Sequence, residues 1–411
     1  MFKFGQPVLW QGGLPGPLHC FAEQIIVQKL YLNSEVVSMP SRLEIPPKNN
    51  MDLLRVIFGL IVVFAHIYAL TKSKNLLCLK NMFDGELAVR CFFVVSGFLI
   101  FMSYEKSKSN ISYLEKRIRR IYPAYFCVVV SAAIFGAFLT KLPIGDYFGM
   151  GLLKYLIFNL SFLNSITPSL PGVFVNDPTT PVNGALWTIK VEMGFYIVVP
   201  LLVWLMNRFS RLGVILTLYA LSLTWRILFD HFASSTGQSI YLEIGKQLPG
   251  QLSFFLSGAA IYYCFPWFMR SLKWLFPAAL VGAVLAQHFS IAPMLPACLA
   301  IVVMAIAFGP YLGNAGKYGD ISYGIYIYHY PIIQTVIFFG LFDQHSWAAL
   351  VLVLIISTSI SFISWHFVEK PFLQKTSHYR VMETAGLPFD DRYVNEAYGS
   401  ASSIQPATDD N

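Results

Sequence analysis

The run LLRVIFGLIVVFAHIYAL occupies residues 53–70 and contains no acidic residue. A helix that crosses a membrane needs about 20 mainly apolar residues, because the hydrocarbon core is about 30 Å thick. The run therefore predicts a transmembrane helix. It also places two basic side chains, Arg55 and His66, at depths where charge is costly.

The rest of the chain has the same character. Of its 411 residues, 56% are hydrophobic and only 12% are charged, whereas a soluble globular protein carries about 25% charged residues. A chain so poor in charge cannot cover a water-facing surface, so we predict one large membrane domain in a lipid bilayer. The net charge of +7 fits Lys and Arg in short loops, where they help to fix orientation. It does not indicate nucleic-acid binding.

The predicted fold is all-α: a polytopic transmembrane helical bundle of about ten spans. A further apolar run at residues 152–163 is shorter and contains Asn159, which favours a re-entrant or interfacial helix. The ten expected spans lie at residues 53–70, 87–104, 122–140, 185–205, 212–229, 249–265, 274–289, 291–309, 321–342 and 347–368.

The charges of the loops predict the orientation. The segment 106–120 is strongly basic, so the positive-inside rule assigns it to the cytoplasm. With ten spans, both termini are then cytoplasmic. We expect residues 1–50 to be a poorly ordered cytoplasmic extension, 51–373 to be the membrane domain, and 374–411 to be a polar cytoplasmic tail.

Several ionisable residues fall inside the predicted spans. Such residues often mark functional sites, although some only hold helices together or reach the interface from a helix end. His66, Glu192 and His329 lie well inside their spans and favour a functional interpretation. Arg55, Arg226, His366 and Glu369 fit the structural interpretation by position. The GxSxG, P-loop and HExxH signatures are missing, and no metal site is predicted.

Six motifs in a fixed order resemble the acyltransferase 3 family. In its first helix an Arg and a His are separated by ten residues, as Arg55 and His66 are here. The other five are FFVVSGFLI at 92–100, RIRRIYPAY at 117–125, the W-x4-E-x2-FY pattern at 187–196, ISYGIYIYHYP at 321–331 and VEKPF at 368–372. The resemblance extends from about residue 50 to residue 373.

The resemblance implies a bacterial inner-membrane O-acyltransferase. Such an enzyme moves an acyl group, most often acetyl, from cytoplasmic acyl-CoA to a hydroxyl group of O-antigen, exopolysaccharide or capsule. Acyl-CoA is then a co-substrate, and no permanently bound cofactor is expected. The residues implied as catalytic are Arg55, His66 and Glu192; those implied for acyl-CoA are Arg117, Arg120 and Tyr122; those implied for the carbohydrate are Trp187, Tyr326 and His329.

The roles within the predicted site are our hypotheses. His66 is assigned as the base or acyl relay, because imidazole changes its protonation near neutral pH. Either His329 or Glu192 would orient His66 or bind the acceptor.

Two residues depart from the family pattern. Arg90 stands where many members carry a small, acidic or amide residue, and Lys190 stands where Ser is common. They would favour an anionic acceptor or a dicarboxylic acyl donor such as succinyl-CoA. The alternative, which we prefer at this point, is that one of them balances Glu192.

Two questions stay open from the sequence. The loop 166–184 precedes the Glu192 helix and is either an acceptor-binding loop or a simple connector. A polysaccharide transporter or flippase for a lipid-linked glycan would also have about ten helices and buried charges. The Arg55–His66 spacing and the basic pair Arg117 and Arg120 favour the enzyme.

Overall fold

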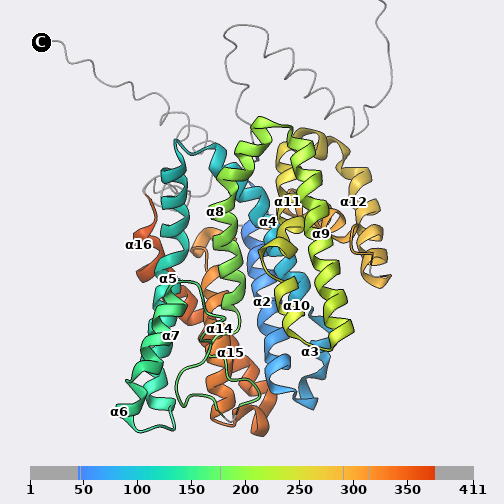
Figure 1. Ribbon diagram of the computed structural model, residues 1–411. Coiled ribbons are helices and arrows are strands. Elements are labelled where there is room, and N and C mark those ends of the chain that lie inside the picture. The colour runs from blue at the N-terminus through green and yellow to red at the C-terminus, as the bar shows by residue number, and fades with distance from the viewer. Residues whose placement is uncertain (1–44, 47, 176, 290, 314, 375–411) are drawn as a thin grey trace, which may run out of the picture.

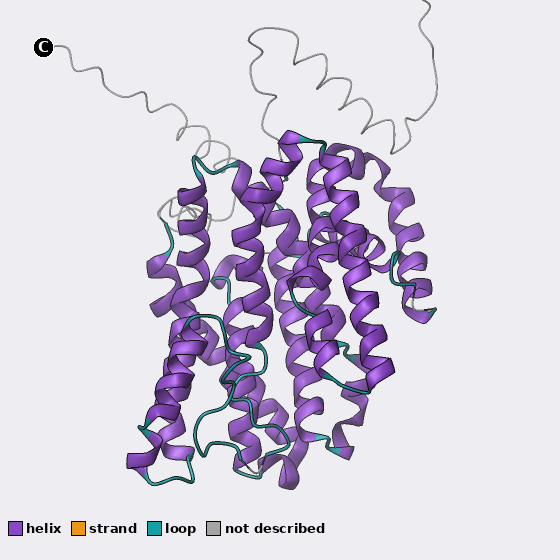
Figure 2. Cartoon of the chain, viewed as in Figure 1, coloured by secondary structure: helices purple, strands orange, loops and turns teal. Residues whose placement is uncertain are grey.

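The computed structural model describes residues 45–46, 48–175, 177–289, 291–313 and 315–374, and this part of the chain is helical without strands (Figure 2). The predicted extension at 1–50 and tail at 374–411 lie almost entirely outside the described residues. The α-helices are α2 (Met51–Thr71), α3 (Leu77–Met82), α4 (Gly85–Glu105), α5 (Asn110–Leu139), α6 (Ile144–Tyr147), α7 (Met150–Leu160), α8 (Leu186–Arg208), α9 (Arg211–Thr236), α10 (Ile240–Gly245), α11 (Leu248–Tyr263), α12 (Phe265–His288), α13 (Leu295–Ala307), α14 (Ser322–Phe338), α15 (Leu341–Ser364) and α16 (Lys370–Phe372).

Each predicted span corresponds to one helix, but the predicted count of ten spans is not confirmed. In the described part of the chain, seven helical segments are long and apolar enough to cross a membrane. The remaining three predicted spans are α11, α13 and α14, with 16, 13 and 17 residues. The short run at 152–163 forms α7, which has 11 residues, so its expected helical character and short length are both observed.

One boundary differs from the sequence prediction in a way that matters for the site. The basic segment was predicted as a loop, but α5 already begins at Asn110, where the Ser109 side chain accepts a hydrogen bond from the backbone N–H of Ser112. The helix has 30 residues, about 45 Å at 1.5 Å per residue, which exceeds the hydrocarbon thickness. Its first turns therefore place the arginines at defined positions on a helix.

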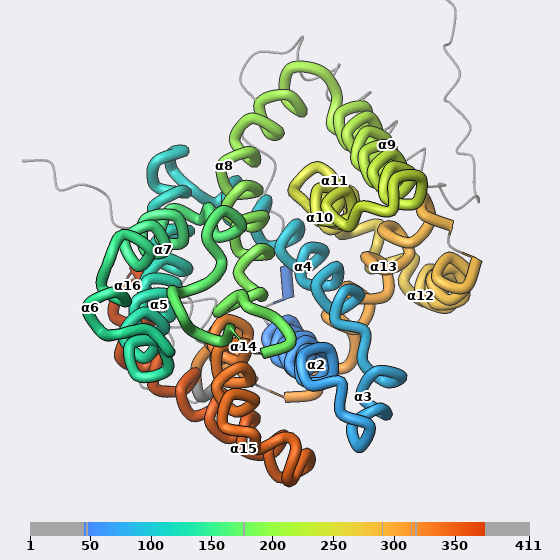
Figure 3. The backbone as a smooth tube through the Cα atoms, turned by 60° about the horizontal axis from the view of Figure 1, so that its bottom comes forward, coloured from blue at the N-terminus to red at the C-terminus, as the bar shows by residue number. Residues whose placement is uncertain are grey.

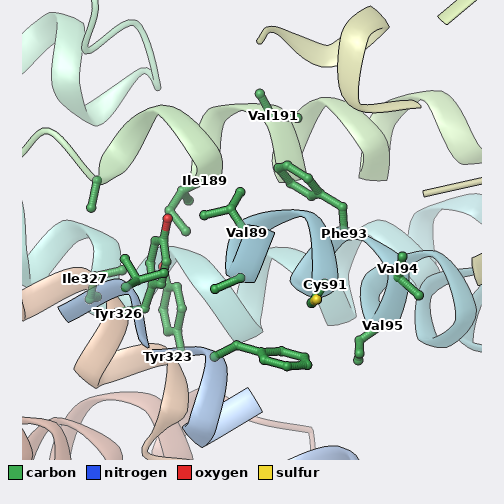
Figure 4. Close-up of a cluster of buried hydrophobic side chains, with 14 of the residues drawn as sticks. Val89, Cys91, Phe93, Val94, Val95, Ile189, Val191, Tyr323, Tyr326 and Ile327 are labelled. Atoms are coloured by element: carbon green, nitrogen blue, oxygen red, sulfur yellow. The ribbon is translucent and has the colours of Figure 1, made fainter. Parts of the chain in front are cut away.

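The helices pack around a centre formed by α2, α4, α8 and α14. Seen along the helix axes, α2 lies beside both α4 and α14, while α9 and α12 lie at the periphery (Figures 1 and 3). Side chains of α4, α8 and α14 form an apolar layer between them (Figure 4). The layer includes Val89 and Phe93 of α4, Ile189 of α8, and Tyr323 and Tyr326 of α14.

The connection between α7 and α8 is held against α14. The side-chain amide of Gln334 donates to the carbonyl groups of Thr179 and Pro181 at 2.8 and 3.1 Å. The amide of Asn183 donates to the carbonyl of Ile327 at 2.8 Å. The loop predicted as either acceptor-binding or a connector is therefore fixed along the side of α14.

Two glycines allow α4 and α11 to cross at backbone contact. A Cβ atom at Gly97 would lie 1.9 Å from the carbonyl oxygen of Phe255, and one at Gly258 would lie 2.0 Å from that of Val94. Small residues at membrane helix crossings permit such close approach. The contact fixes α4, which carries part of the centre, against α11.

Substitution of Gly97 by Ala is expected to lower the free energy of unfolding by about 1–3 kcal/mol, because the helices must separate to admit the methyl group. The measurement is the apparent unfolding temperature of the purified protein in detergent. Gly145→Ala is the control, because a Cβ at that position meets nothing within 4 Å. Equal unfolding temperatures for the two variants would contradict this account of the crossing.

Candidate functional site

The helices α2 and α14 run side by side in the same direction, and two polar contacts join them, one near each end of α2. At the Met51 end, Arg55 contacts Asp320, which lies just before α14. At the Thr71 end, His66 contacts His329. Arg55 and His66 are eleven positions apart, which is about 16 Å along a helix and about three turns, so both face α14. They are therefore not a contact pair, although the sequence resemblance groups them.

The histidine pair is joined by a hydrogen bond. Nδ1 of His66 lies 2.9 Å from Nε2 of His329, and the rings are stacked with centroids 5.1 Å apart. His329 is fully buried, whereas His66 is only partly buried. His66 is thus the more exposed member of the pair.

The contacts of His329 define which nitrogen atoms carry hydrogen. Nδ1 of His329 lies 3.1 Å from the carbonyl oxygen of Ile325, which can only accept, so Nδ1 of the neutral ring is the donor. Its Nε2 is then an acceptor, and Nδ1 of His66 must donate to it. In the neutral pair, Nε2 of His66 consequently has a free lone pair. This assignment makes His329 the orienting partner of His66.

Aromatic residues surround the histidine pair. The ring of Tyr330 meets His66 edge-on at 5.2 Å between centroids. Tyr330 also contacts the connection between α7 and α8, because a Cβ at Gly184 would lie 2.7 Å from its ring. The hydroxyl of Tyr326, one of the residues predicted for the carbohydrate, shares a 2.8 Å hydrogen bond with Thr188. Tyr326 thus joins α14 to α8 beside the pair.

A network of charged residues lies at the other end of α2. Oδ2 of Asp320 accepts a hydrogen bond from Arg55 at 2.5 Å and another from Arg120. Arg120 also donates to Glu369 at 3.1 Å, and Ser322 donates to Asp320 at 2.5 Å. Burial alone would raise the pKa of the Asp320 carboxyl, but Arg55 and Arg120 hold that pKa well below its usual range. The network therefore joins α2, α5, the start of α14 and the segment Trp365–Glu369 that follows α15.

This network bears on three predicted residues. Glu369 and Arg55 fitted a structural interpretation by position, although the resemblance also implied Arg55 as catalytic, and both take part in the buried network that holds helices together. Arg120 was predicted to serve acyl-CoA, but its guanidinium is engaged by two carboxylates and lies over the ring of Trp365 at 5.1 Å. Its position fits a residue that holds helices together.

Arg117 and Glu192 both contact Tyr196. The carboxylate of Glu192 accepts a 2.7 Å hydrogen bond from the hydroxyl of Tyr196, and the guanidinium of Arg117 lies 5.9 Å from the centre of that ring. Nε of Arg117 is buried without a hydrogen-bond partner among the described residues. Glu192 thus shares Tyr196 with Arg117, and of the two residues that the sequence offered as partners of His66, His329 is the one hydrogen-bonded to it.

The preferred explanation of Arg90 and Lys190 is wrong, because neither is paired with Glu192. Arg90 donates to Glu86 at 2.5 Å, and Lys190 donates to Ser165 at 3.0 Å.

Two predicted aromatic residues are half-buried. Trp187 is half-buried in the packing of the centre. Tyr122 is half-buried beside Phe162, with ring centroids 6.1 Å apart.

Sequence reasoning missed two acidic residues. Asp320 stands two positions before the motif helix and is 1% exposed, and it was not considered because it lies outside the apolar run. Glu86 precedes Arg90 by one helical turn. That spacing is a recognisable signal for an ion pair and could have identified the partner of Arg90.

Comparison with known proteins agrees with the motif pattern. The model of the acyltransferase domain family matches residues 48–366. The chain belongs to the acyltransferase 3 family. Its fold and membership make it a membrane acyltransferase.

This acyltransferase is similar to proteins of bacteria and of a phage. Nodulation protein 10 of Rhizobium leguminosarum bv. viciae is 26% identical over 360 residues, covering 80% of this chain and 94% of that protein. The O-acetyl transferase of Shigella phage Sf6 is 26% identical, with 80% and 97% covered. The peptidoglycan O-acetyltransferase OatA of Listeria monocytogenes is 24% identical, with 70% and 51% covered. No solved structure matches this acyltransferase significantly.

Two neighbouring arginines test the role of the charged network. Arg120→Gln is expected to destabilise the protein by about 3–5 kcal/mol, because it leaves buried carboxylates without their cation. Arg119→Gln is the matched control, since Arg119 is 46% exposed and pairs with Glu115 on the same helix, and such a pair contributes at most about 1 kcal/mol. The apparent unfolding temperature in detergent measures both. Equal losses would exclude a structural role specific to Arg120.

Proposed function

We propose that this acyltransferase moves an acetyl group from cytoplasmic acyl-CoA to a hydroxyl group of a carbohydrate at the opposite face of the bacterial inner membrane. The observation that carries the proposal is the neutral His66–His329 pair, in which Nε2 of His66 keeps its lone pair. A group that takes the proton of an attacking hydroxyl needs such an unprotonated nitrogen.

The proposed direction follows from the charges and the helix order. The basic start of α5 lies in the cytoplasm by the positive-inside rule, so the Met51 end of α2 is cytoplasmic and the Thr71 end faces outward. Arg55 then lies near the donor side and His66 near the acceptor side. Their separation of about 16 Å is one that the extended pantetheine arm of CoA can cover.

The proposed reaction is a direct transfer. The acceptor hydroxyl gives its proton to Nε2 of His66 while its oxygen attacks the thioester carbonyl. The new C–O bond forms, the C–S bond breaks, and the thiolate of CoA accepts the proton. His329 stabilises the protonated His66, because it accepts the Nδ1–H hydrogen bond. Arg117, with its unpartnered Nε, is the better candidate of the predicted arginine pair for the phosphates of CoA.

The relatives support the type of acceptor. One is named an exopolysaccharide production protein, from Rhizobium meliloti, and another a peptidoglycan O-acetyltransferase. Both names refer to carbohydrate polymers outside the cytoplasm. We therefore favour an exopolysaccharide, O-antigen or capsule as the acceptor of this chain.

Transfer of label from acetyl-labelled acetyl-CoA to surface polysaccharide tests the proposal. Membranes that contain the protein are expected to label the polysaccharide, and His66→Ala is expected to reduce the rate by about 100-fold or more, because the base is lost. His231→Ala is the control, since His231 lies exposed on α9. Full activity of His66→Ala would remove His66 from the mechanism. No label from acetyl-CoA or succinyl-CoA would instead favour the glycan transporter.

The orienting role of His329 has a separate test. His329→Leu is expected to lower kcat by at least about 10-fold with KM for the acceptor little changed, because His66 loses the partner that fixes its tautomer. His329→Gln is expected to recover part of kcat, since its side-chain oxygen can accept from Nδ1 of His66. Equal kcat values for the Leu and Gln variants would show that His329 serves packing alone.

A further inference from the structure

Glu86, Arg90 and Arg226 form a charged cluster outside the site described above. Glu86 and Arg90 lie one turn apart on α4, and Arg226 lies on α9. Both arginines donate to the same carboxylate oxygen, Oε1 of Glu86, at 2.5 Å from Arg90 and 2.7 Å from Arg226. The cluster therefore contains two cations and one anion.

The donors of the cluster exceed its acceptors. Each guanidinium has five N–H bonds, and Nε of Arg90 and Nη1 of Arg226 are buried without a hydrogen-bond partner among the described residues. The nearby carboxylate of Asp84 is used to cap α4, where it accepts from the backbone N–H of Leu87 at 3.0 Å. Phe254 lies against the guanidinium of Arg90 at 5.4 Å, but an aromatic ring does not replace an anion. Within a membrane such an excess of positive charge is costly.

The position of the cluster indicates where the missing anion comes from. Glu86 is the second residue of α4, so the cluster lies within about two turns of the end of that helix. The same end carries the histidine pair, because Gly85 lies against Ala65, the neighbour of His66. At this depth the hydrocarbon gives way to the headgroup region, where lipid phosphates lie. The side chains of Arg90 and Arg226 are 12% and 18% exposed.

We propose that Arg90 and Arg226 bind a phosphate oxyanion at the membrane surface, and that Glu86 holds both guanidinium groups for it. Arginine suits this ligand because its planar N–H groups match phosphate oxygens in pairs. The phosphate belongs either to a membrane lipid headgroup or to a diphosphate group such as one that links a glycan to a lipid. The proposal concerns binding alone and does not depend on acyl transfer.

The test measures ligand-dependent stabilisation of the purified full chain in an uncharged detergent. The two probes are inorganic pyrophosphate and a short-chain phosphatidylglycerol, and sodium chloride of equal ionic strength is the reference. A ligand that binds the folded state raises the unfolding temperature in a saturable way. Arg226→Gln is expected to raise the probe concentration at half-saturation by about 10-fold or more, because a charge-assisted hydrogen bond is lost. Arg208→Gln, at the exposed end of α8, is expected to behave as the unmodified protein.

Glu86→Gln gives the opposite prediction and decides between a ligand site and a structural cluster. Gln keeps a side-chain oxygen that can hold the two guanidinium groups, but it lacks the negative charge that repels a phosphate. The phosphate probe is therefore expected to bind more tightly than to the unmodified protein. Stabilisation by pyrophosphate supports a diphosphate group, and stabilisation by the lipid alone supports a headgroup. No saturable stabilisation beyond that of sodium chloride would overturn the proposal. If Arg226→Gln does not fold, weaker or unchanged binding by Glu86→Gln would also overturn it.

Discussion

The carboxylate of Asp320 joins segments that are far apart in the sequence. It accepts hydrogen bonds from Arg55 of α2 and Arg120 of α5 just before α14 begins, and Arg120 extends the contact to Glu369. In a bundle so poor in charge, each member is costly unless it is paired. Pairing these residues brings together α2, α5, the start of α14 and the segment Trp365–Glu369 after α15, so the network stabilises the packing of these helices.

The same contact sets the register of the histidine pair. Arg55 and Asp320 fix the Met51 end of α2 against the start of α14, and the two helices then run together with Gly59 against Ser322 and Ile325. Because α-helices rise by a constant amount per residue, this register brings His66 level with His329. A shift of α2 by one residue would turn His66 about 100° away from its partner. Residues remote from the histidines therefore determine whether their hydrogen bond can form.

The sequence could predict the helices but not the partners. Apolar runs such as 53–70 identify membrane helices because the bilayer requires length and hydrophobicity locally. The motif order also identified His66, His329 and Glu192. Which residues meet depends on packing between helices hundreds of residues apart: Arg120 meets Asp320, and His66 meets His329. Local spacing could have revealed only pairs within one helix, such as Glu86 and Arg90.

One end of α2 buries charged groups and the other buries a pair of imidazole rings, and this difference affects which end suits proton transfer. Asp320 and the two arginines that contact it are charged and already paired, so a reaction there would have to break stabilising contacts. The histidine pair is neutral in its resting state and acquires charge only when His66 accepts a proton. In a medium of low dielectric constant, oriented groups stabilise a charge that develops during reaction without having to rearrange. The two hydrogen bonds that link His66 to His329 and His329 to the carbonyl of Ile325 are oriented in this way. Proton transfer at this pair would therefore disturb the structure less than it would at the Asp320 network.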